Sequence, residues 1–525
     1  MPRPSGQHAL DAMSLVLDAL DRVLAEPQTA QRWHRLMAFR EASSDVGARQ
    51  AALDRLKTAE FADPRTEILR LTFLARATGD DEFEVRAAQR TLEILPADPD
   101  RLAASLAFRW LSALQDLDGR EAFVAALVSG MAPELAARLA RLATDLPPVL
   151  LPRATRDVQR VAVVTPYIGH RFHTPSAMAV EQCRVLARSG LQVRVFSAQE
   201  LVPPDAGLFR GDGRDLKLPP LDARSWSGLL PAGVNMTIAD VRYGLAGRWK
   251  NLLATIAEFD PEAVLLVGLY SPFAAALHAV RPAVGISVNS VPPLAPLDVW
   301  LAAPNETAEQ DPWRGRFAPT RCIEHPYRIR RRQDIEPLSR AQLDIADDAV
   351  VWVTAGFRLE HEIRGEWARR VADLVARRPE VVWLIVGGEG TMPAALSASP
   401  GGRIRALPTR DDLPAVLRCS DIYVNPPRMG GGFSVAEAMG EGLAVATLSG
   451  SDGGDKVGAL AFPDLDGYLR GLEALTASAE ARRSMGTSLQ QRFAERFDLD
   501  NSGPALLAAF REAAQLAQER FNRPS

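Results

Sequence analysis

The chain has 525 residues, of which 47% are hydrophobic and 24% charged, and its formal net charge is −4 at pH 7. A chain of this length holds two or three domains, each large enough to bury its own core. The composition is ordinary for a soluble globular protein. The slightly acidic balance argues against a nucleic-acid-binding protein, because such proteins present basic surfaces.

The cysteines and the hydropathy pattern indicate the compartment. Cys183, Cys322 and Cys419 lie far apart and form neither a disulfide framework nor a zinc-binding pattern. No apolar run reaches the roughly 18–20 residues that a membrane span needs, and the N-terminus lacks a signal-peptide pattern. We therefore expect a cytoplasmic protein with no transmembrane segment, for which peripheral membrane contact stays open.

Residues 1–150 are predicted to form an all-α domain. Apolar residues recur there at spacings of three and four, as in Leu10, Met13, Leu17, Leu20 and Val23. Residues 90–115 resemble the join between two tetratricopeptide repeats, because a helix ends at Leu95-Pro96 and an Asp-Pro turn follows. A plain helical bundle is the alternative to a helical repeat.

A proline-rich segment at 145–152 separates these helices from two predicted α/β domains. In residues 151–330 a strand, a helix and a second strand form a βαβ unit, which is typical of a parallel sheet. Residues 345–500 repeat the alternation, and residues 501–525 form a last helix. The pattern predicts two tandem Rossmann-like domains with the ligand beyond the carboxyl ends of the strands.

The most informative segment spans residues 421–449, which indicate a strand, a glycine turn, a helix and a second strand. Gly430, Gly431 and Gly432 let the backbone approach a ligand, and the helix that follows, beginning near Ser434, offers free N–H groups to a phosphate. Phe433 and Ser434 are therefore candidate nucleotide-binding residues. Glu437, one turn into the helix, is placed to accept hydrogen bonds from sugar or ribose hydroxyls. The alternative is an ordinary βαβ turn whose glycines only cap and pack.

This segment resembles the nucleotide-sugar site of GT-B glycosyltransferases of the retaining, glycogen-synthase-like type (glycosyltransferase group 1, family 4). The matching motifs are Asn425-Pro426, the three glycines, Glu437-Ala438-Met439 and Gly442-Leu443-Ala444-Val445. The resemblance implies a GT-B fold in which residues 151–330 bind the acceptor, residues 345–500 bind the donor and the last helix returns to the first Rossmann-like domain. It also implies that Glu437 binds the nucleotide ribose and that Asn425 borders the nucleotide. The family has a second Glu where this chain has Met429.

The loop after the first strand of the second α/β domain supports the same resemblance. The family shows Gly-Arg-Leu, followed by a Lys five residues after the Arg; here Gly356 and Arg358 match, and Ile363 stands at the Lys position. The resemblance implies that Arg358 neutralises the diphosphate, for which a planar guanidinium is well suited. The alternative for Arg358 is a surface ion pair. Gly388, in the turn 387–390, is expected to border the nucleotide.

Three further positions are weaker candidates. His173, in the loop after the first strand of residues 151–330, is placed to act as a base toward an acceptor hydroxyl or to donate to a phosphate; a solvated polar loop is the alternative. Asn289 stands where the family often has a His. Lys456 either reaches a phosphate or is solvated, and the sequence favours the solvated position.

The predicted function is therefore a glycosyltransferase that moves a sugar from a nucleoside diphosphate sugar to a glycan, lipid-linked glycan or protein acceptor. His173, Arg358 and Glu437 are the predicted catalytic residues. Retention is implied by the resemblance, and neither a metal nor another cofactor is expected. Two alternatives stay open: a protein-modifying enzyme whose helical domain binds a polypeptide, and a degenerate non-catalytic GT-B scaffold.

Overall fold

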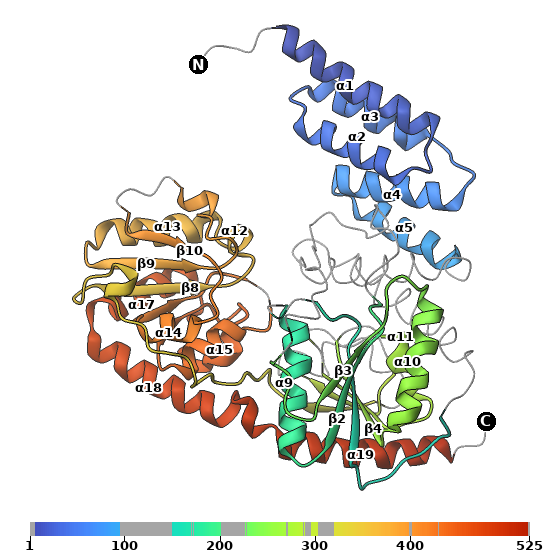
Figure 1. Ribbon diagram of the computed structural model, residues 1–525. Helices are drawn as coiled ribbons and strands as arrows, with labels where there is room; N and C mark the ends of the chain where they lie inside the picture. The colour runs from blue at the N-terminus through green and yellow to red at the C-terminus, as the bar shows by residue number, and fades with distance from the viewer. Residues whose placement is uncertain are drawn as a thin grey trace.

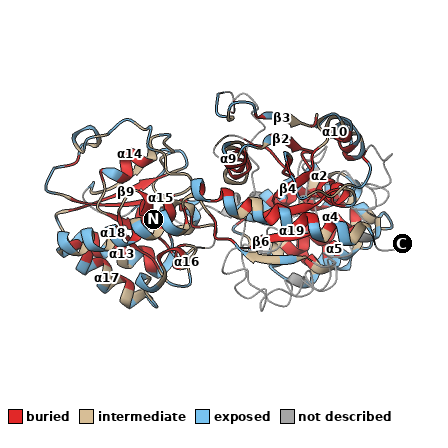
Figure 2. Cartoon of the chain, turned by 90° about the horizontal axis from the view of Figure 1, so that it is seen from below, coloured by how far each residue is buried: buried red, intermediate tan, exposed pale blue. Residues whose placement is uncertain are grey.

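The computed structural model describes most of the chain, namely residues 6–94, 150–169, 171, 173–200, 226, 228–268, 271–286, 288, 296–302, 320–397, 402–428 and 430–522. Two α/β domains lie side by side, and a set of helices stands beyond the first of them (Figure 1). Buried residues concentrate in the strands and on the inner faces of the helices (Figure 2). No helix within these ranges is long and apolar enough to cross a membrane.

The N-terminal region consists of helices over its described residues. They are α1 (Gly6–Ala25), α2 (Ala30–Ala42), α3 (Val46–Thr58), α4 (Pro64–Thr78) and α5 (Asp81–Ile94). Asp45 and Asp63 begin α3 and α4, because their carboxylates accept from the backbone N–H groups of Ala48 and Thr66, each at 2.9 Å. The helical prediction is confirmed here, whereas most of the repeat-like join at 90–115 lies outside the described residues.

The first α/β domain is built on a parallel sheet with the strand order β3-β2-β1-β4-β5-β6-β7. The strands are β1 (Arg160–Val164), β2 (Gln192–Ser197), β3 (Asn235–Ile238), β4 (Ala263–Val267), β5 (Ala283–Ile286), β6 (Val299–Ala302) and β7 (Arg321–Glu324). The helices α9 (Thr174–Arg188), α10 (Leu245–Phe259) and α11 (Pro272–His278) connect them. The strand order reverses at β1, so the loops after β1 and β4 lie at a topological switch point.

The second α/β domain has a smaller parallel sheet with the order β10-β9-β8-β11-β12. Its strands are β8 (Val350–Ala355), β9 (Val381–Val386), β10 (Ile404–Leu407), β11 (Ile422–Val424) and β12 (Ala444–Ala446). Its helices are α12 (Leu359–Glu362), α13 (Gly365–Arg377), α14 (Leu413–Arg418), α15 (Phe433–Gly440), α16 (Gly454–Val457), α17 (Leu465–Ala477) and α18 (Ala479–Arg496). Here the order reverses between β8 and β11, which places the ligand crevice beyond these two strands.

The last helix, α19 (Gly503–Phe521), leaves the second domain and packs on the first (Figure 1). Its residues Leu506, Phe510 and Ala513 belong to the buried cluster of the first sheet. The interdomain linker pairs with the chain before α19, because Ile329 exchanges backbone hydrogen bonds with Phe497 and Leu499, each at 2.9 Å. The two passages of the chain between the domains are therefore joined to each other.

Candidate functional site

The loop after β8 meets the loop after β11 at the switch point of the second sheet. A Cβ at Gly356, in the loop after β8, would lie 2.7 Å from Nη1 of Arg428, in the loop after β11. A Cβ at Gly387, after β9, would stand only 1.7 Å from the carbonyl oxygen of Gly356. The packing of these loops therefore requires glycine, and it brings the predicted residues 356–358 next to the glycine loop.

The three glycines before α15 differ in their surroundings. Gly432 has φ +60°, and a Cβ there would lie 2.2 Å from the carbonyl oxygen of Asp452. At Gly431 a Cβ would lie 2.3 Å from the ring of Phe433, whereas at Gly430 the nearest heavy atoms are 3.5 Å or more away. Packing alone thus explains glycine at 431 and 432, whereas a Cβ at 430 would make only ordinary van der Waals contacts, so packing does not require glycine there.

The N-terminus of α15 carries no side-chain cap, because its N-cap residue is Gly432. The first intrahelical bond is donated by the N–H of Ala436 to the carbonyl oxygen of Gly432. Ser434, in the first turn, accepts a hydrogen bond of 2.7 Å from Nη2 of Arg428. The ring of Phe433 packs at 5.8 Å from that of Tyr327 in the interdomain linker.

Arg358 reaches the glycine loop. Its Nη2 would lie 3.7 Å from a Cβ at Gly430, and it pairs at 2.9 Å with a carboxylate oxygen of Glu362. The Arg358 side chain is 49% exposed. Arg358 thus forms the ion pair that was the alternative and also lies near Gly430, while its contact with a diphosphate stays a prediction.

Arg428 is a residue of this site that the sequence analysis missed. Its side chain is only 5% exposed, and it forms ion pairs with Glu362 at 2.9 Å and with Asp452 at 3.3 Å. These carboxylates, together with Tyr423, raise the pKa of its guanidinium above the usual value. An arginine between Pro427 and the glycine run, at the end of a strand, is the signal that was available.

Lys456 is buried, so the solvated position favoured from the sequence is wrong. Its side chain is 1% exposed, and its Nζ lies 3.6 Å from a carboxylate oxygen of Asp455. The ammonium stands over the rings of Tyr327 and Phe497, at 5.8 and 5.3 Å from their centroids. A Cβ at Gly432 would lie 2.8 Å from Cε of Lys456, which places the lysine against the start of α15. Burial lowers the pKa of its ammonium.

Glu437 is joined to the interdomain linker. Nη2 of Arg332 donates to Oε1 of Glu437 at 2.8 Å, and Nη1 of Arg332 donates to the backbone carbonyl of Asp411 at 2.9 Å. The carboxylate of Asp411 in turn pairs at 2.5 Å with Arg171 of the first domain. A series of polar contacts thus connects Glu437, the residue predicted to bind the ribose, with the loop that follows β1.

Asn425 and Gly388 have structural partners. The fully buried amide of Asn425 donates to Thr447, Ser451 and Asp452 at 3.0 to 3.3 Å, which ties the end of β11 to the loop after β12. Gly388 has φ +55° and open space at its Cβ position, and its carbonyl oxygen accepts from the N–H of Thr409 at 3.0 Å. Both predicted nucleotide contacts stay predictions.

His173 is the N-cap residue of α9. Its Nδ1 lies 2.7 Å from Oγ of Ser176, which also accepts from the N–H of Gly169 at 3.0 Å. Burial lowers the pKa of the imidazole to about 4. His173 is thus a neutral, partly buried imidazole rather than part of a solvated loop, and only its Nε2 is left for a substrate. Met429 and Asn289, the positions that depart from the family pattern, lie outside the described residues.

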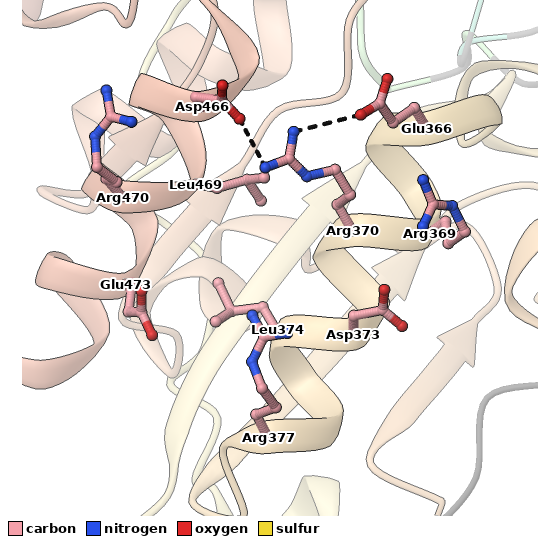
Figure 3. A pocket seen from close by; sticks show the side chains of 10 residues that line it. All are labelled: Glu366, Arg369, Arg370, Asp373, Leu374, Arg377, Asp466, Leu469, Arg470 and Glu473. Atoms are coloured by element: carbon pink, nitrogen blue, oxygen red, sulfur yellow. Dashed lines mark hydrogen bonds and ion pairs between the residues drawn. The ribbon is translucent and has the colours of Figure 1, made fainter.

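The polar groove between α13 and α17 is separate from this site. It has a volume of about 440 Å³ and carries charges of both signs, with Arg370 bridging Glu366 at 3.4 Å and Asp466 at 2.7 Å (Figure 3). None of the residues around the glycine loop lines it. Within the ranges that the structure describes, no group of three or more His, Cys, Asp or Glu side chains is arranged to hold a metal ion.

A comparison with protein families decides the identity of the domain that holds the glycine loop. Residues 350–477 match the family model described as "Glycosyl transferases group 1". The second α/β domain is a glycosyltransferase group 1 domain. The resemblance to glycosyltransferase group 1 is thereby confirmed, as is the prediction of a glycosyltransferase enzyme, whereas the retaining type stays a prediction. The sequence matches no curated protein.

Solved structures extend the likeness to the fold of the whole chain. A mutant of the O-GlcNAc transferase of Thermobaculum terrenum has 15% sequence identity and a TM-score of 0.54, and the match covers 98% of this chain and 100% of that one. This glycosyltransferase likeness confirms the GT-B fold with preceding helices. A glycosyltransferase from Rickettsia africae has 9% identity and a TM-score of 0.46, covering 70% of this chain and 100% of that one. A putative UDP-N-acetylglucosamine 2-epimerase from Listeria monocytogenes has 14% identity and a TM-score of 0.45, covering 68% and 96%.

Proposed function

We propose that this glycosyltransferase takes its sugar from a nucleoside diphosphate sugar whose diphosphate binds beside Gly430. The observation that carries the proposal is the convergence of Arg358, Arg428 and Lys456 on the uncapped start of α15, at the switch point of the second sheet. Cations are unfavourable near the positive end of a helix dipole. A buried ammonium and two guanidinium groups placed there suit a site that receives an anion.

The leaving diphosphate would be stabilised electrostatically. Arg358 is half exposed and close to Gly430, so it is the cation best placed to contact phosphate oxygens. Lys456 would add positive potential from inside the domain, where charges act over longer distances than in water. These groups, with the N–H groups of α15, can offset charge that develops on the leaving group without a metal ion. Glu437 would bind the ribose, in competition with its present partner Arg332.

The acceptor would bind on the side of the first domain, as a glycan, a lipid-linked glycan or a protein. Helices α1–α5 and one face of the first sheet contribute to a single buried cluster, which includes Trp33, Phe73, Phe196 and Trp249. The helical region is therefore assigned to the acceptor side, where it would shape the acceptor's access. Retention of the anomeric configuration belongs to the proposal through the family resemblance, and NMR of the product tests it.

A thermal-shift panel of nucleoside diphosphates and their sugars tests the donor assignment. A ligand at one hundred times its Kd stabilises the folded state by about 2.7 kcal/mol, so one base should raise the melting temperature by several degrees while its monophosphate raises it less. Donor hydrolysis is then measured with and without EDTA. If no nucleoside diphosphate or diphosphate sugar shifts the transition, the donor proposal is wrong, and binding without hydrolysis or transfer would favour the non-catalytic scaffold.

A further inference from the structure

The side chain of Arg428 bonds to several elements around the strand ends of the second domain. Nη1 donates to the carbonyl oxygen of Ala355 at 3.2 Å and to Oε2 of Glu362 at 2.9 Å. Nη2 donates to the hydroxyl groups of Tyr423 at 3.1 Å and Ser434 at 2.7 Å. One buried guanidinium therefore holds the end of β8, helix α12, strand β11 and the first turn of α15.

The same guanidinium reaches the loop after β12, because its Nε lies 3.3 Å from Oδ2 of Asp452. These contacts lie on both sides of the switch point between β8 and β11. The fork of an arginine can serve such partners at once, whereas the single ammonium of a lysine cannot match its directions. The position of the loop at 356–362 relative to the loop at 430–434 thus depends on one side chain.

Arg428 also connects with Arg358 through a shared carboxylate. Glu362 receives Arg428 on Oε2 and Arg358 on the other oxygen, each at 2.9 Å. The carboxylate that Arg428 holds is therefore the one that fixes Arg358 beside Gly430. Displacement of Glu362 would move the half-exposed arginine that is best placed to meet the donor.

The charge of Arg428 matters as well as its shape. Its two acidic partners, Glu362 and Asp452, are almost completely buried. Two uncompensated carboxylates beneath the glycine loop would repel an incoming diphosphate. The buried guanidinium compensates the charge of both carboxylates, so the positive potential at the start of α15 remains available to an anion.

We propose that Arg428 is a positioning residue of the donor site: it sets the loop at 356–362 against the start of α15 and offsets the charges of Glu362 and Asp452, without contacting the donor. This inference rests on the proposed function for its consequence in catalysis. Its structural part, the ordering of the two loops, can be measured with no donor present.

The test compares Arg428→Lys with a matched control, Arg281→Lys. Arg281 is another buried arginine with several bonds, to the carbonyl oxygens of Pro261 and Leu151 and to Asp260, but it lies in the first domain. We expect Arg428→Lys to weaken nucleoside diphosphate binding at least tenfold in calorimetry and to speed amide hydrogen exchange at 356–362 and 430–435. The control should change neither. Equal donor affinity and equal exchange in Arg428→Lys and wild type would overturn the proposal.

Two further variants separate positioning from general packing. In an Arg428→Gln background, Asp452→Asn should recover part of the donor affinity, because it removes a repelling carboxylate and leaves Glu362 in place as the partner of Arg358. Tyr423→Phe deletes a buried hydroxyl that accepts from Arg428 and also bonds to the backbone of Ala355 at the end of β8, without touching the donor. This variant should lower donor affinity about two- to fivefold, because the loops lose an anchoring hydrogen bond. It replaces Arg428→Lys in the test if that variant does not fold. No recovery in the double variant together with full affinity in Tyr423→Phe would overturn the proposal.

If wild type binds no nucleoside diphosphate, the donor proposal fails instead, and faster exchange in Arg428→Lys still supports the ordering role.

Discussion

The two α/β domains share a parallel sheet with a reversal of strand order, but they hold their strand-end loops by different means. In the first domain, side chains bond to backbone carbonyl groups: the amide of Gln199 donates to the carbonyl oxygen of Ile168 at 3.0 Å, and Nε1 of Trp226 donates to that of Gly169 at 2.8 Å. The buried guanidinium of Arg248 likewise donates to the carbonyl oxygen of Gln199 at 2.9 Å. In the second domain, the buried guanidinium of Arg428 and two carboxylates hold the loops. The difference is therefore in the partners: backbone carbonyl groups in the first domain, and buried carboxylates in the second.

The largest expected effect concerns Gly432, whose left-handed conformation begins α15. Gly432→Ala adds backbone strain of about 1–3 kcal/mol and a Cβ that would lie 2.2 Å from the carbonyl oxygen of Asp452. The start of α15 must then shift, and we expect calorimetry to show loss of donor binding together with a lower melting temperature.

Gly402→Ala is the control for Gly432→Ala. Gly402 has φ +65° in the same domain, with nothing within 4 Å of its Cβ position. It should lose stability from strain alone and keep donor affinity. If both variants bind the donor as wild type does, the start of α15 is not the phosphate site.

The next effect concerns Arg358, which the second domain places beside Gly430. Arg358→Ala should lower turnover about 10²- to 10³-fold, the usual result of removing one donor to a developing anion. The melting temperature should change little, because Arg358 is half exposed and Glu362 keeps Arg428 as its second partner. Steady-state donor hydrolysis and thermal unfolding measure the two quantities.

Arg370→Ala is the matched control for Arg358, because Arg370 also forms an i,i+4 pair on a helix of the same domain, in the groove of Figure 3. It should leave turnover unchanged. A near-normal rate in Arg358→Ala with a clearly lowered melting temperature would show that Arg358 is a structural ion-pair residue.

The sequence predicts the second domain better than the first, for physical reasons. In the second domain the strands are apolar runs that end at Gly, Pro or Asn, and the glycine loop is recognisable from local spacing. Strands β3, β6 and β7 of the first sheet, each four residues long, were not anticipated. Runs this short carry too few residues for a periodic signal.

The buried charges of the site depend on contacts that are distant in sequence. Arg428 bonds to Ala355 and Glu362, which are 73 and 66 residues away. Lys456 is covered by Tyr327 of the linker and Phe497 before α19. Local pattern therefore located the glycine loop and Arg358, while the groups that lie beneath the loop become visible only once the strands are in order.

Substitution of Glu437 should have an intermediate effect on donor affinity. It tests whether Glu437 binds the donor ribose or only holds the interdomain linker. Glu437→Ala should weaken nucleoside diphosphate binding by about 1.5–3 kcal/mol, the range for a lost hydrogen bond to a charged group. Arg332→Ala, which removes the present partner of Glu437, should change affinity less than threefold. Equal losses in both variants, with no further loss in the double variant, would show that Glu437 holds the linker rather than the ribose.

The last prediction is a pH dependence that tests whether a buried carboxyl group of the first domain is protonated in the folded protein. Glu200, at the end of β2, is buried; its Oε1 accepts from Nε1 of Trp249 at 3.0 Å and from the N–H of Phe273 at 2.8 Å. Burial raises the pKa of its carboxyl from 4.5 to about 7. Between these two pH values the folded state keeps a proton that the unfolded state has lost, so the contribution of Glu200 to stability falls as pH rises through this window.

Glu200→Gln mimics the protonated group, so the melting temperature of the variant minus that of wild type should increase from pH 4.5 to 7 and then level off. The low imidazole pKa values of His173 and His325, each about 4, make stability rise with pH from 4 to 6.5. That trend is common to both proteins and cancels in the difference. Thermal unfolding of both proteins at half-unit pH steps measures it. Parallel curves would mean that the pKa of Glu200 is not raised in the folded state, and the first domain would then hold a buried carboxylate as the second domain does.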